Sequence, residues 1–267
     1  MRKLTEHDRT TALRYAAREP DYNLFILGDI ENHGLEGEDV EVFAVDGTDD
    51  GEPYDALLLR YRNSYVACSH HGNYRADLLG SFLQGRHVDC LSGKAETVEK
   101  LLPWLPDKKV RREYLSILTE DHPPEFGLPS GLRERMLTPC DAAEIVGLYA
   151  GIAEFAENYA GKEEAQTENL RFSLGKGGRG IGAFDGDQLV SVACTSAENS
   201  ISAMIVGVAT REEYRRLGLA SRLVASLCTQ CLETGMHTLC LFFDNPLAGA
   251  IYRKIGFRES GSYMLVM

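Results

Sequence analysis

A short run of residues in the C-terminal third of the chain has the composition of an anion-binding turn. Two adjacent arginines, Arg215 and Arg216, precede Gly218 and Ala220, and an apolar helix begins directly afterwards. The first N–H groups of a helix have no intrahelical partner and lie at the positive end of its dipole. Gly218 lets the backbone approach a ligand, and arginine side chains match phosphate oxygens. The turn predicts a diphosphate site; a basic helix start without a ligand is the alternative.

A second group of residues places a capping asparagine, a small residue and a phenol along one side of a helix. Asn245 is a good N-cap residue, Pro246 suits the first helical position, and Gly256 fits just past the helix end. Asn245 and Tyr252 are separated by about two helical turns, so they share one face with Ala248 between them. Taken alone, Tyr252 is also explained as an ordinary half-buried tyrosine.

The elements that would position these residues follow in order along the C-terminal half. Leu219, Leu223, Leu227 and Cys231 form one apolar stripe, which predicts an amphipathic helix packed on a sheet. Before it, Asp141 is a plausible N-cap for a helix. We predict strands at 132–137, 201–210, 237–243 and 257–266, a hairpin of 181–184 with 188–195, and helices at 141–150, 154–169, 219–234 and 246–255.

The N-terminal half repeats this order of elements. The segment from 22 to 30 mixes polar and apolar residues and receives no assignment, and the Pro- and Gly-containing segment 121–131 is typical of a linker. We therefore predict two similarly folded α/β domains, 1–122 and 130–267. The predicted elements are a strand and helix within 2–19, strands at 41–45, 55–61, 64–68, 87–91 and 109–119, and helices at 74–83 and 95–102.

Both candidate groups resemble motifs of one family. Arg215-x-x-Gly218-x-Ala220 is similar to the acetyl-CoA loop of the GNAT superfamily of N-acetyltransferases, and Asn245-x-x-Ala248-x-x-x-Tyr252 resembles a second signature of that family. The resemblance covers about residues 132–267. It implies an α/β (α+β) fold of two tandem GNAT-like domains, each with a mixed, mostly antiparallel central sheet flanked by helices and with splayed central strands. The N-terminal half lacks both motifs, which implies a degenerate copy.

The resemblance also implies a reaction and a set of site residues. An N-acetyltransferase moves the acetyl group from acetyl-CoA to a primary amine by direct attack in a ternary complex. Tyr252 is then the candidate general acid for the leaving thiolate. Glu154, Glu157 or a water chain is the candidate base, with solvent-facing helix charges as the alternative explanation of both glutamates. The candidate coenzyme-binding residues are Val206, Val208, Ala209, Thr210, Arg215, Arg216, Leu217, Gly218, Leu219, Ala220, Ser221, Asn245, Ala248 and Tyr252, with the backbone of Val206, Gly207 and Val208 facing the thioester.

The charge of the chain limits which partners it can have besides the coenzyme. The formal net charge is −12, and between Arg18 and Arg60 thirteen acidic residues occur without any Lys or Arg. Such a surface repels phosphates, so nucleic acid and anionic membranes are not expected as partners. One explanation of this acidic stretch is a solvated face of the protein. The alternative is that the stretch attracts a cationic acceptor, such as an amine or a basic peptide. The acidic residues are Glu19, Asp21, Asp29, Glu31, Glu36, Glu38, Asp39, Glu41, Asp46, Asp49, Asp50, Glu52 and Asp55.

Location, metals and alternative functions follow from the remaining features. No signal core or membrane-length apolar run is present, and the seven cysteines suit a reducing cytoplasm. Cys228 and Cys231 lie mid-helix, and His70 and His71 lack further ligands at metal spacing, so no metal is expected. A homodimer is kept as an alternative to a monomer. Two other functions stay open: a non-catalytic acyl-CoA sensor, and an aminoacyl transferase of the tandem type, against which the acidic charge and the intact coenzyme loop argue.

Overall fold

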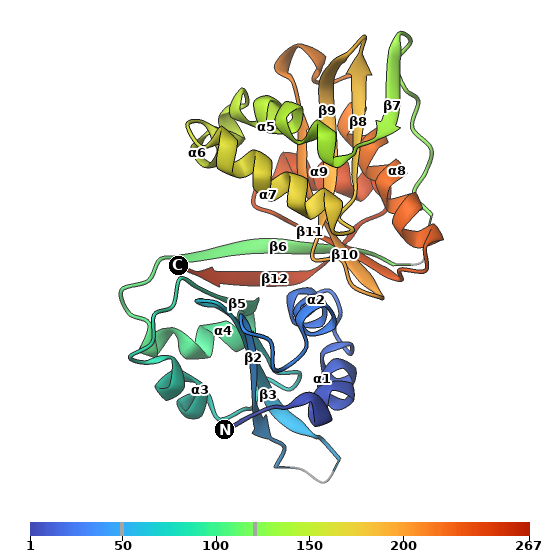
Figure 1. The fold of residues 1–267 in the computed structure, drawn as a ribbon. Coiled ribbons are helices and arrows are strands. Elements are labelled where there is room, and N and C mark those ends of the chain that lie inside the picture. Colours follow the sequence, from blue (N-terminus) through green and yellow to red (C-terminus); the bar gives the residue numbers. More distant parts are fainter. Residues whose placement is uncertain (49–50, 120–121) are drawn as a thin grey trace. The chain divides into compact units, whose positions relative to one another are not determined.

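The chain forms two compact units in a computed structural model that describes residues 1–48, 51–119 and 122–267 (Figure 1). Asp49 and Asp50 of the acidic stretch and Asp121, the first residue of the predicted linker, lie outside these ranges. The units are not continuous in sequence, and the domain boundaries 1–122 and 130–267 stay a prediction. The first unit comprises Met1–Leu115, Phe242–Asp244 and Glu259–Met267, and the second comprises Ser116–Leu241 and Asn245–Arg258.

The first unit is a sheet between two pairs of helices, α1 with α2 on one face and α3 with α4 on the other (Figure 1). Its strands follow the order β1-β2-β3-β4-β5-β12-β6, in which β4 and β5 are parallel and the neighbouring pairs from β1 to β4 are antiparallel. The elements are β1 Arg2–Lys3, α1 Arg9–Ala16, α2 Leu24–His33, β2 Val40–Asp46, β3 Tyr54–Tyr61, β4 Ser64–Cys68, α3 Ala76–Leu83, β5 Cys90–Lys94, α4 Ala95–Val98, β6 Val110–Thr119 and β12 Arg258–Val266.

The core of the first unit explains why β3 is apolar on both sides. Residues 56 to 59 are all buried. Alternate side chains of this run, Ala56 and Leu58, pack in one cluster with Leu79 and Leu83 of α3. Because strand side chains alternate, the residues between them face the opposite side of the sheet. Helices on both faces therefore select an uninterrupted apolar run.

Two features of the first unit differ from the prediction. Helix α2 occupies part of the segment from 22 to 30, which received no assignment. The helix is buried on most sides, so its sequence lacks the polar face that marks an amphipathic helix. Strand β5 is displaced by three residues from the predicted 87–91. Its parallel register with β4, Ser64 beside Cys90 and Ala67 beside Gly93, sets these bounds.

The second unit has the same plan, which confirms the predicted fold class of mixed, mostly antiparallel sheets flanked by helices. Its strands follow the order β7-β8-β9-β10-β11, with α5 to α7 on one face and α8 and α9 on the other (Figure 1). Only β10 and β11 are parallel among the described pairs of this unit. The elements are β7 Leu132–Met136, α5 Ala142–Ala150, α6 Ala153–Tyr159, α7 Glu163–Gly175, β8 Gly180–Asp185, β9 Gln188–Ser196, β10 Ser202–Thr210, α8 Leu219–Glu233, β11 Thr238–Phe243 and α9 Pro246–Ile255.

The start of α5 differs in detail from the prediction that Asp141 caps it. Asp141 stands at the N-cap position, but its side chain makes no cap bond to the helix. It accepts instead from the backbone N–H of Thr138, at 2.7 Å, and from Arg135. The carboxylate therefore ties the helix entry back to the strand before it.

Candidate active site

Strand β10 separates from β11 part of the way along its length. Their parallel pairing covers Ser202–Met204 and Thr238–Cys240, whereas β10 continues to Thr210. On its other edge β10 follows β9, with a register shift between Val206 and Ala209. Within that shift Gly207 has a φ of 61°, a left-handed conformation that favours glycine. The splay and the bulge predicted for these central strands are thus present.

The turn after β10 contains two residues with left-handed backbone angles. Arg216 has a φ of 67° and Gly218 a φ of 82°, while Arg215 is extended, with a φ of −66° and a ψ of 156°. Gly218 is the N-cap residue of α8 and has no side chain to cap it, and a Cβ there would stand in open space. Because the first N–H groups of a helix have no intrahelical partner, the start of α8 beside this open space suits an anion.

Two predicted site residues are joined by an ion pair. The Arg215 guanidinium contacts Glu154 Oε2 at 3.1 Å and donates to the Thr210 carbonyl at 3.3 Å. Arg215 holds the pKa of the Glu154 carboxyl below its usual value, so Glu154 is a weaker base while this pair persists. Glu157 is exposed on the same helix, α6.

Helix α9 carries the second predicted group and packs against α8. Asn245 is exposed at its start, where its carbonyl accepts from the Gly249 N–H at 3.2 Å. Ala248 and Tyr252 are half-buried, and the Tyr252 ring meets Phe257 edge-on at 6.1 Å. Burial raises the pKa of the Tyr252 phenol, which keeps its proton available at neutral pH.

The remaining predicted coenzyme residues lie along the strand, turn and helix. Ala209 and Leu219 are buried and anchor the two ends of the turn. Leu217 is 50% exposed at its tip. The hydroxyl of Ser191 donates to the Ala209 carbonyl at 3.0 Å, which fixes the end of β10. Val206, Val208, Thr210, Ala220 and Ser221 are half-buried, and Arg216 is exposed.

Sequence reasoning missed one residue beside β10. Tyr149 of α5 is 2% exposed, and its hydroxyl donates to the Gly207 carbonyl at 2.8 Å. In the sequence Tyr149 is one aromatic residue within an apolar helix, and nothing in its spacing distinguishes it from a core residue. The glycine in β10 was the only signal, and it did not indicate a partner.

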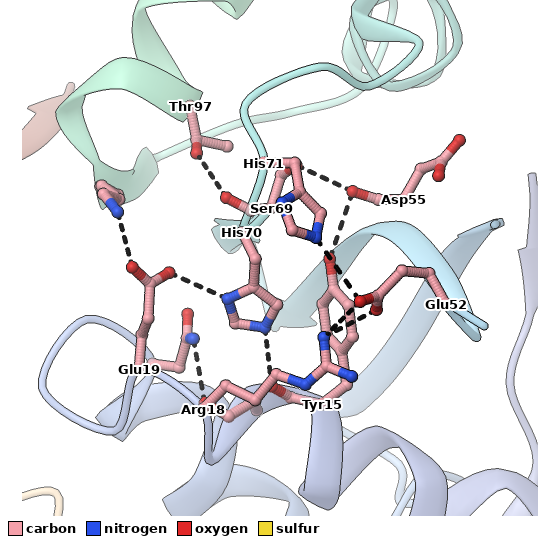
Figure 2. Close-up of polar contacts among 12 residues, drawn as sticks. Tyr15, Arg18, Glu19, Glu52, Asp55, Ser69, His70, His71 and Thr97 are labelled. Carbon is pink, nitrogen blue, oxygen red and sulfur yellow. Dashed lines mark hydrogen bonds and ion pairs between the residues drawn. The ribbon is translucent and has the colours of Figure 1, made fainter. Parts of the chain in front are cut away.

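In the first unit, the loop after β4 corresponds to the turn after β10 of the second unit. Side chains of the chain itself fill this loop (Figure 2). Strand β4 stays paired with β5 as far as Ala67 and Gly93. The next residue after β4, Ser69, donates to the Asp55 carbonyl at 2.8 Å. His70 lies with its side chain only 7% exposed and its ring 4.3 Å from that of Tyr15. This loop therefore lacks both the splay and the open turn of the second unit.

A charged network holds His70 in place (Figure 2). One ring nitrogen contacts Glu19 Oε2 at 2.9 Å and the other the Tyr15 carbonyl at 2.8 Å. Lys94 donates to the second Glu19 oxygen at 2.6 Å. Burial acts to raise the pKa of Glu19, but the bonds from His70 and Lys94 outweigh it and leave that pKa below its usual value. The ring of His70 is thus held by a hydrogen bond at each of its two nitrogens.

The discounted cysteines behave as core residues. Cys228 and Cys231 are buried on α8, and burial raises the pKa of both thiols, that of Cys231 to about 11. Such thiols are poor nucleophiles and poor metal ligands at neutral pH. In the described ranges, no group of three or more His, Cys, Asp or Glu side chains is arranged to hold a metal. Nor does any described helix have the length and apolar content to cross a membrane.

Comparison with known proteins places this geometry in a family. The GNAT acetyltransferase family matches residues 164–266. A protein from Drosophila superposes with a TM-score of 0.74 at 13% identity, over 100% of this chain and 97% of its own. A GCN5-related N-acetyltransferase from Sphaerobacter thermophilus gives 0.63 at 18% identity, over 99% and 93%. A tandem GNAT protein from the clavulanic acid biosynthesis pathway gives 0.59 at 13% identity, over 99% and 96%.

At such identities the superposed structures establish the fold, and no curated protein matches the sequence. The family match covers α7 from its second residue, the splayed strand β10, the turn from Arg215 to Ala220 and α9. Residues 164–266 of this chain therefore form a domain of the GNAT acetyltransferase family.

Proposed function

We propose that the second unit transfers an acetyl group from acetyl-CoA to a primary amine in a ternary complex. The observation that carries the proposal is the continuity between the bulged end of β10 and the open turn from Arg215 to Ala220. A thioester beside the strand and a diphosphate at the turn would be held by one stretch of backbone. Holding the acyl donor and the amine together lowers the entropic part of the barrier.

The proposed chemistry divides among few groups. The neutral amine attacks the thioester carbonyl, and backbone N–H groups of Val206 to Val208 stabilise the charge that develops on its oxygen. The carbon–sulfur bond then breaks, and the Tyr252 hydroxyl protonates the leaving thiolate. The ammonium proton passes to a base, for which Glu154, Glu157 and a water chain remain the candidates. Diphosphate binding at the turn competes with Glu154 for Arg215, which would return Glu154 to a stronger base.

Calorimetric titration with acetyl-CoA tests the coenzyme site. We expect Arg215→Gln to weaken binding about tenfold, because it removes a charge-assisted contact to the diphosphate. Acetyl-pantetheine, which carries the thioester without the diphosphate, should bind both proteins equally. Arg171→Gln is the matched control, because Arg171 is also an exposed, ion-paired arginine of this unit. Equal affinity of all three proteins for acetyl-CoA would contradict the proposed diphosphate site.

The acceptor is sought by thiol release over a panel of amines. Polyamines, amino acids and aminoglycosides form the first panel, since each offers a primary amine with different surroundings. Saturable thiol release with one class would identify the acceptor. Tight acetyl-CoA binding without release from any amine would instead favour a non-catalytic acyl-CoA sensor.

A further inference from the structure

Tyr149 is held rigidly beside the bulge of β10. Its ring stacks on Phe155 with centroids 4.8 Å apart and lies 4.8 Å from the ring of Tyr159. Its hydroxyl donates to the Gly207 carbonyl at 2.8 Å, with Cys194 Sγ at 3.9 Å as a second, weaker contact. Burial raises the pKa of the Tyr149 phenol, so the hydroxyl stays protonated and acts as the donor.

The peptide that accepts this bond has little freedom to turn. Gly207 has a left-handed φ of 61° within the register shift of β10, and a Cβ on it would collide with the Tyr149 hydroxyl. Ala209 is buried on one side of the bulge and Ile205 on the other, at 5% and 3% exposure. The Tyr149 hydroxyl therefore holds the Gly207 carbonyl toward α5, and the buried residues Ile205 and Ala209 hold the strand before and after it.

The orientation of that carbonyl determines the direction of one N–H group. In a trans peptide the C=O and the following N–H point in opposite directions. Because the Gly207 carbonyl points toward Tyr149, the Val208 N–H points away from α5. A hydrogen bond to a peptide carbonyl also polarises the peptide, which makes its N–H a stronger donor.

We propose that Tyr149 is a positioning residue for acetyl transfer: its hydroxyl orients and polarises the Gly207–Val208 peptide, so that the Val208 N–H is presented to the carbonyl oxygen of the thioester. This inference rests on the proposed acetyltransferase function. Tyr149 acts only through that peptide, and the reacting atoms touch Val208. Its contribution grows as negative charge develops on the oxygen, so it raises kcat more than it lowers KM.

Two unreactive analogues of acetyl-CoA separate this role from general support of the fold. One is a ketone in which a methylene replaces the thioester sulfur, so the carbonyl is kept. The other is S-ethyl-CoA, a thioether without a carbonyl. We expect the wild type to prefer the ketone, and Tyr149→Phe to lose most of that preference while its affinity for S-ethyl-CoA stays within twofold. In turnover, kcat should fall about tenfold with little change in KM for acetyl-CoA.

Tyr159→Phe is the matched control, because it removes a hydroxyl from the same aromatic cluster without touching the Gly207 bond. The control should retain the ketone preference and kcat. The inference is overturned if Tyr149→Phe keeps the ketone preference of the wild type. It is equally overturned if Tyr149→Phe weakens both analogues by the same factor, since the hydroxyl would then serve only the fold.

If Tyr149→Phe does not fold, fluorotyrosines at position 149 test the role of the hydroxyl instead, because they keep the shape of the side chain. A more acidic phenol donates a stronger hydrogen bond, so kcat should change steadily with phenol acidity while S-ethyl-CoA affinity stays constant. A kcat independent of acidity would overturn the inference. Failure of the proposed function has a separate signature in the wild type itself, which would bind neither analogue or would release no thiol with any amine, and the inference would fall with it.

Discussion

Two glycines in left-handed conformations have opposite surroundings in the second unit. At Gly207 a Cβ would strike the Tyr149 hydroxyl, whereas at Gly218 it would enter open space. The first glycine is required by a close contact inside the protein, and the second leaves room beside free N–H groups. The neighbouring side chains differ in the same way. Tyr149, beside Gly207, is buried, whereas Arg215, in the turn with Gly218, is 42% exposed.

Tyr252 gives the residue-scale prediction. Its raised pKa keeps the phenol protonated, so under the proposed function Tyr252→Phe should lower kcat about a hundredfold and change KM for acetyl-CoA little. Steady-state thiol release with the identified amine is the measurement. Tyr61→Phe, a half-buried tyrosine of the first unit, is the control. A Tyr252→Phe enzyme with wild-type kcat would remove Tyr252 from the role of general acid.

At the scale of elements, both units begin with the same strand-to-helix device. Arg2 bonds Asp8 at 3.0 Å in the first unit, and Arg135 bonds Asp141 at 2.7 Å in the second. In each, the aspartate also accepts from the N–H of a threonine three residues earlier, at 3.0 Å and 2.7 Å. The spacing Arg-x-Leu-Thr-x-x-Asp therefore occurs in both halves, starting at Arg2 and at Arg135. It is a short internal repeat of the sequence, which adds residue identity to the repeated order of elements.

This device predicts how stability depends on pH. The side-chain bond from Arg135 is the main cause that lowers the pKa of Asp141 to about 2, from a model-compound value near 3.8. A lowered folded-state pKa contributes stability above the unfolded value, and this contribution is lost as pH falls through the folded value. Asp141→Asn should therefore cost about 1 kcal/mol at pH 7, after allowance for solvent screening.

Urea unfolding at a series of pH values provides the measurement. The difference between wild type and Asp141→Asn should shrink as pH falls from about 4 toward 2. Glu38→Gln, an exposed carboxylate without a described ion pair, should show no such trend. A difference that is constant with pH would show that the charge of Asp141 does not contribute.

At the scale of the whole molecule, the acidic stretch is less free than its composition suggests. Glu41 contacts both Lys3 and Arg60 at 2.6 Å, and Glu52 contacts Arg18 at 2.7 Å. These cations lie outside the acidic stretch in sequence or at its ends, so the fold neutralises part of the charge. Attraction of a cationic acceptor by this stretch stays a prediction, with fewer unpaired carboxylates to support it. Lysine and arginine side chains also pair with Glu19 (Lys94), Asp46 (Arg2) and Asp39 (Arg62).

The first unit depends on the last strand of the chain. Tyr263 pairs with Lys94 and Val266 with Leu91 across β12 and β5, and both β12 side chains are buried. A fragment of residues 1–122 would expose this edge of β5 and the apolar surface that β12 covers. We predict that the fragment alone is unfolded or aggregated, and that a synthetic peptide of residues 258–267 restores its circular dichroism and cooperative unfolding.

The control peptide carries Val266→Asp, which places a charge where a fully buried side chain packs. It should not restore the fold. A fragment that unfolds cooperatively without any peptide would show that β12 is dispensable for the first unit.

Much of the fold follows from local patterns. Alternation and apolar stripes predicted β4 and α9 with their observed bounds and α8 within one residue at its end. The turn from Arg215 to Ala220 was recognisable for the same reason, because its glycine, arginines and helix start are adjacent in the chain. Local stereochemistry decides such features, and sequence displays it directly.

Tertiary structure decided what depends on distant partners. The ion pair of Arg215 with Glu154 and the bond from Tyr149 to Gly207 join residues that are far apart in the chain. The membership of β12 in the first unit likewise arises from its pairing with β5. Such contacts form because packing closes long loops, and the side chains involved have no spacing that marks them in advance. The sequence therefore determined which chemistry is available, and the tertiary structure decided which groups hold the reacting backbone in place.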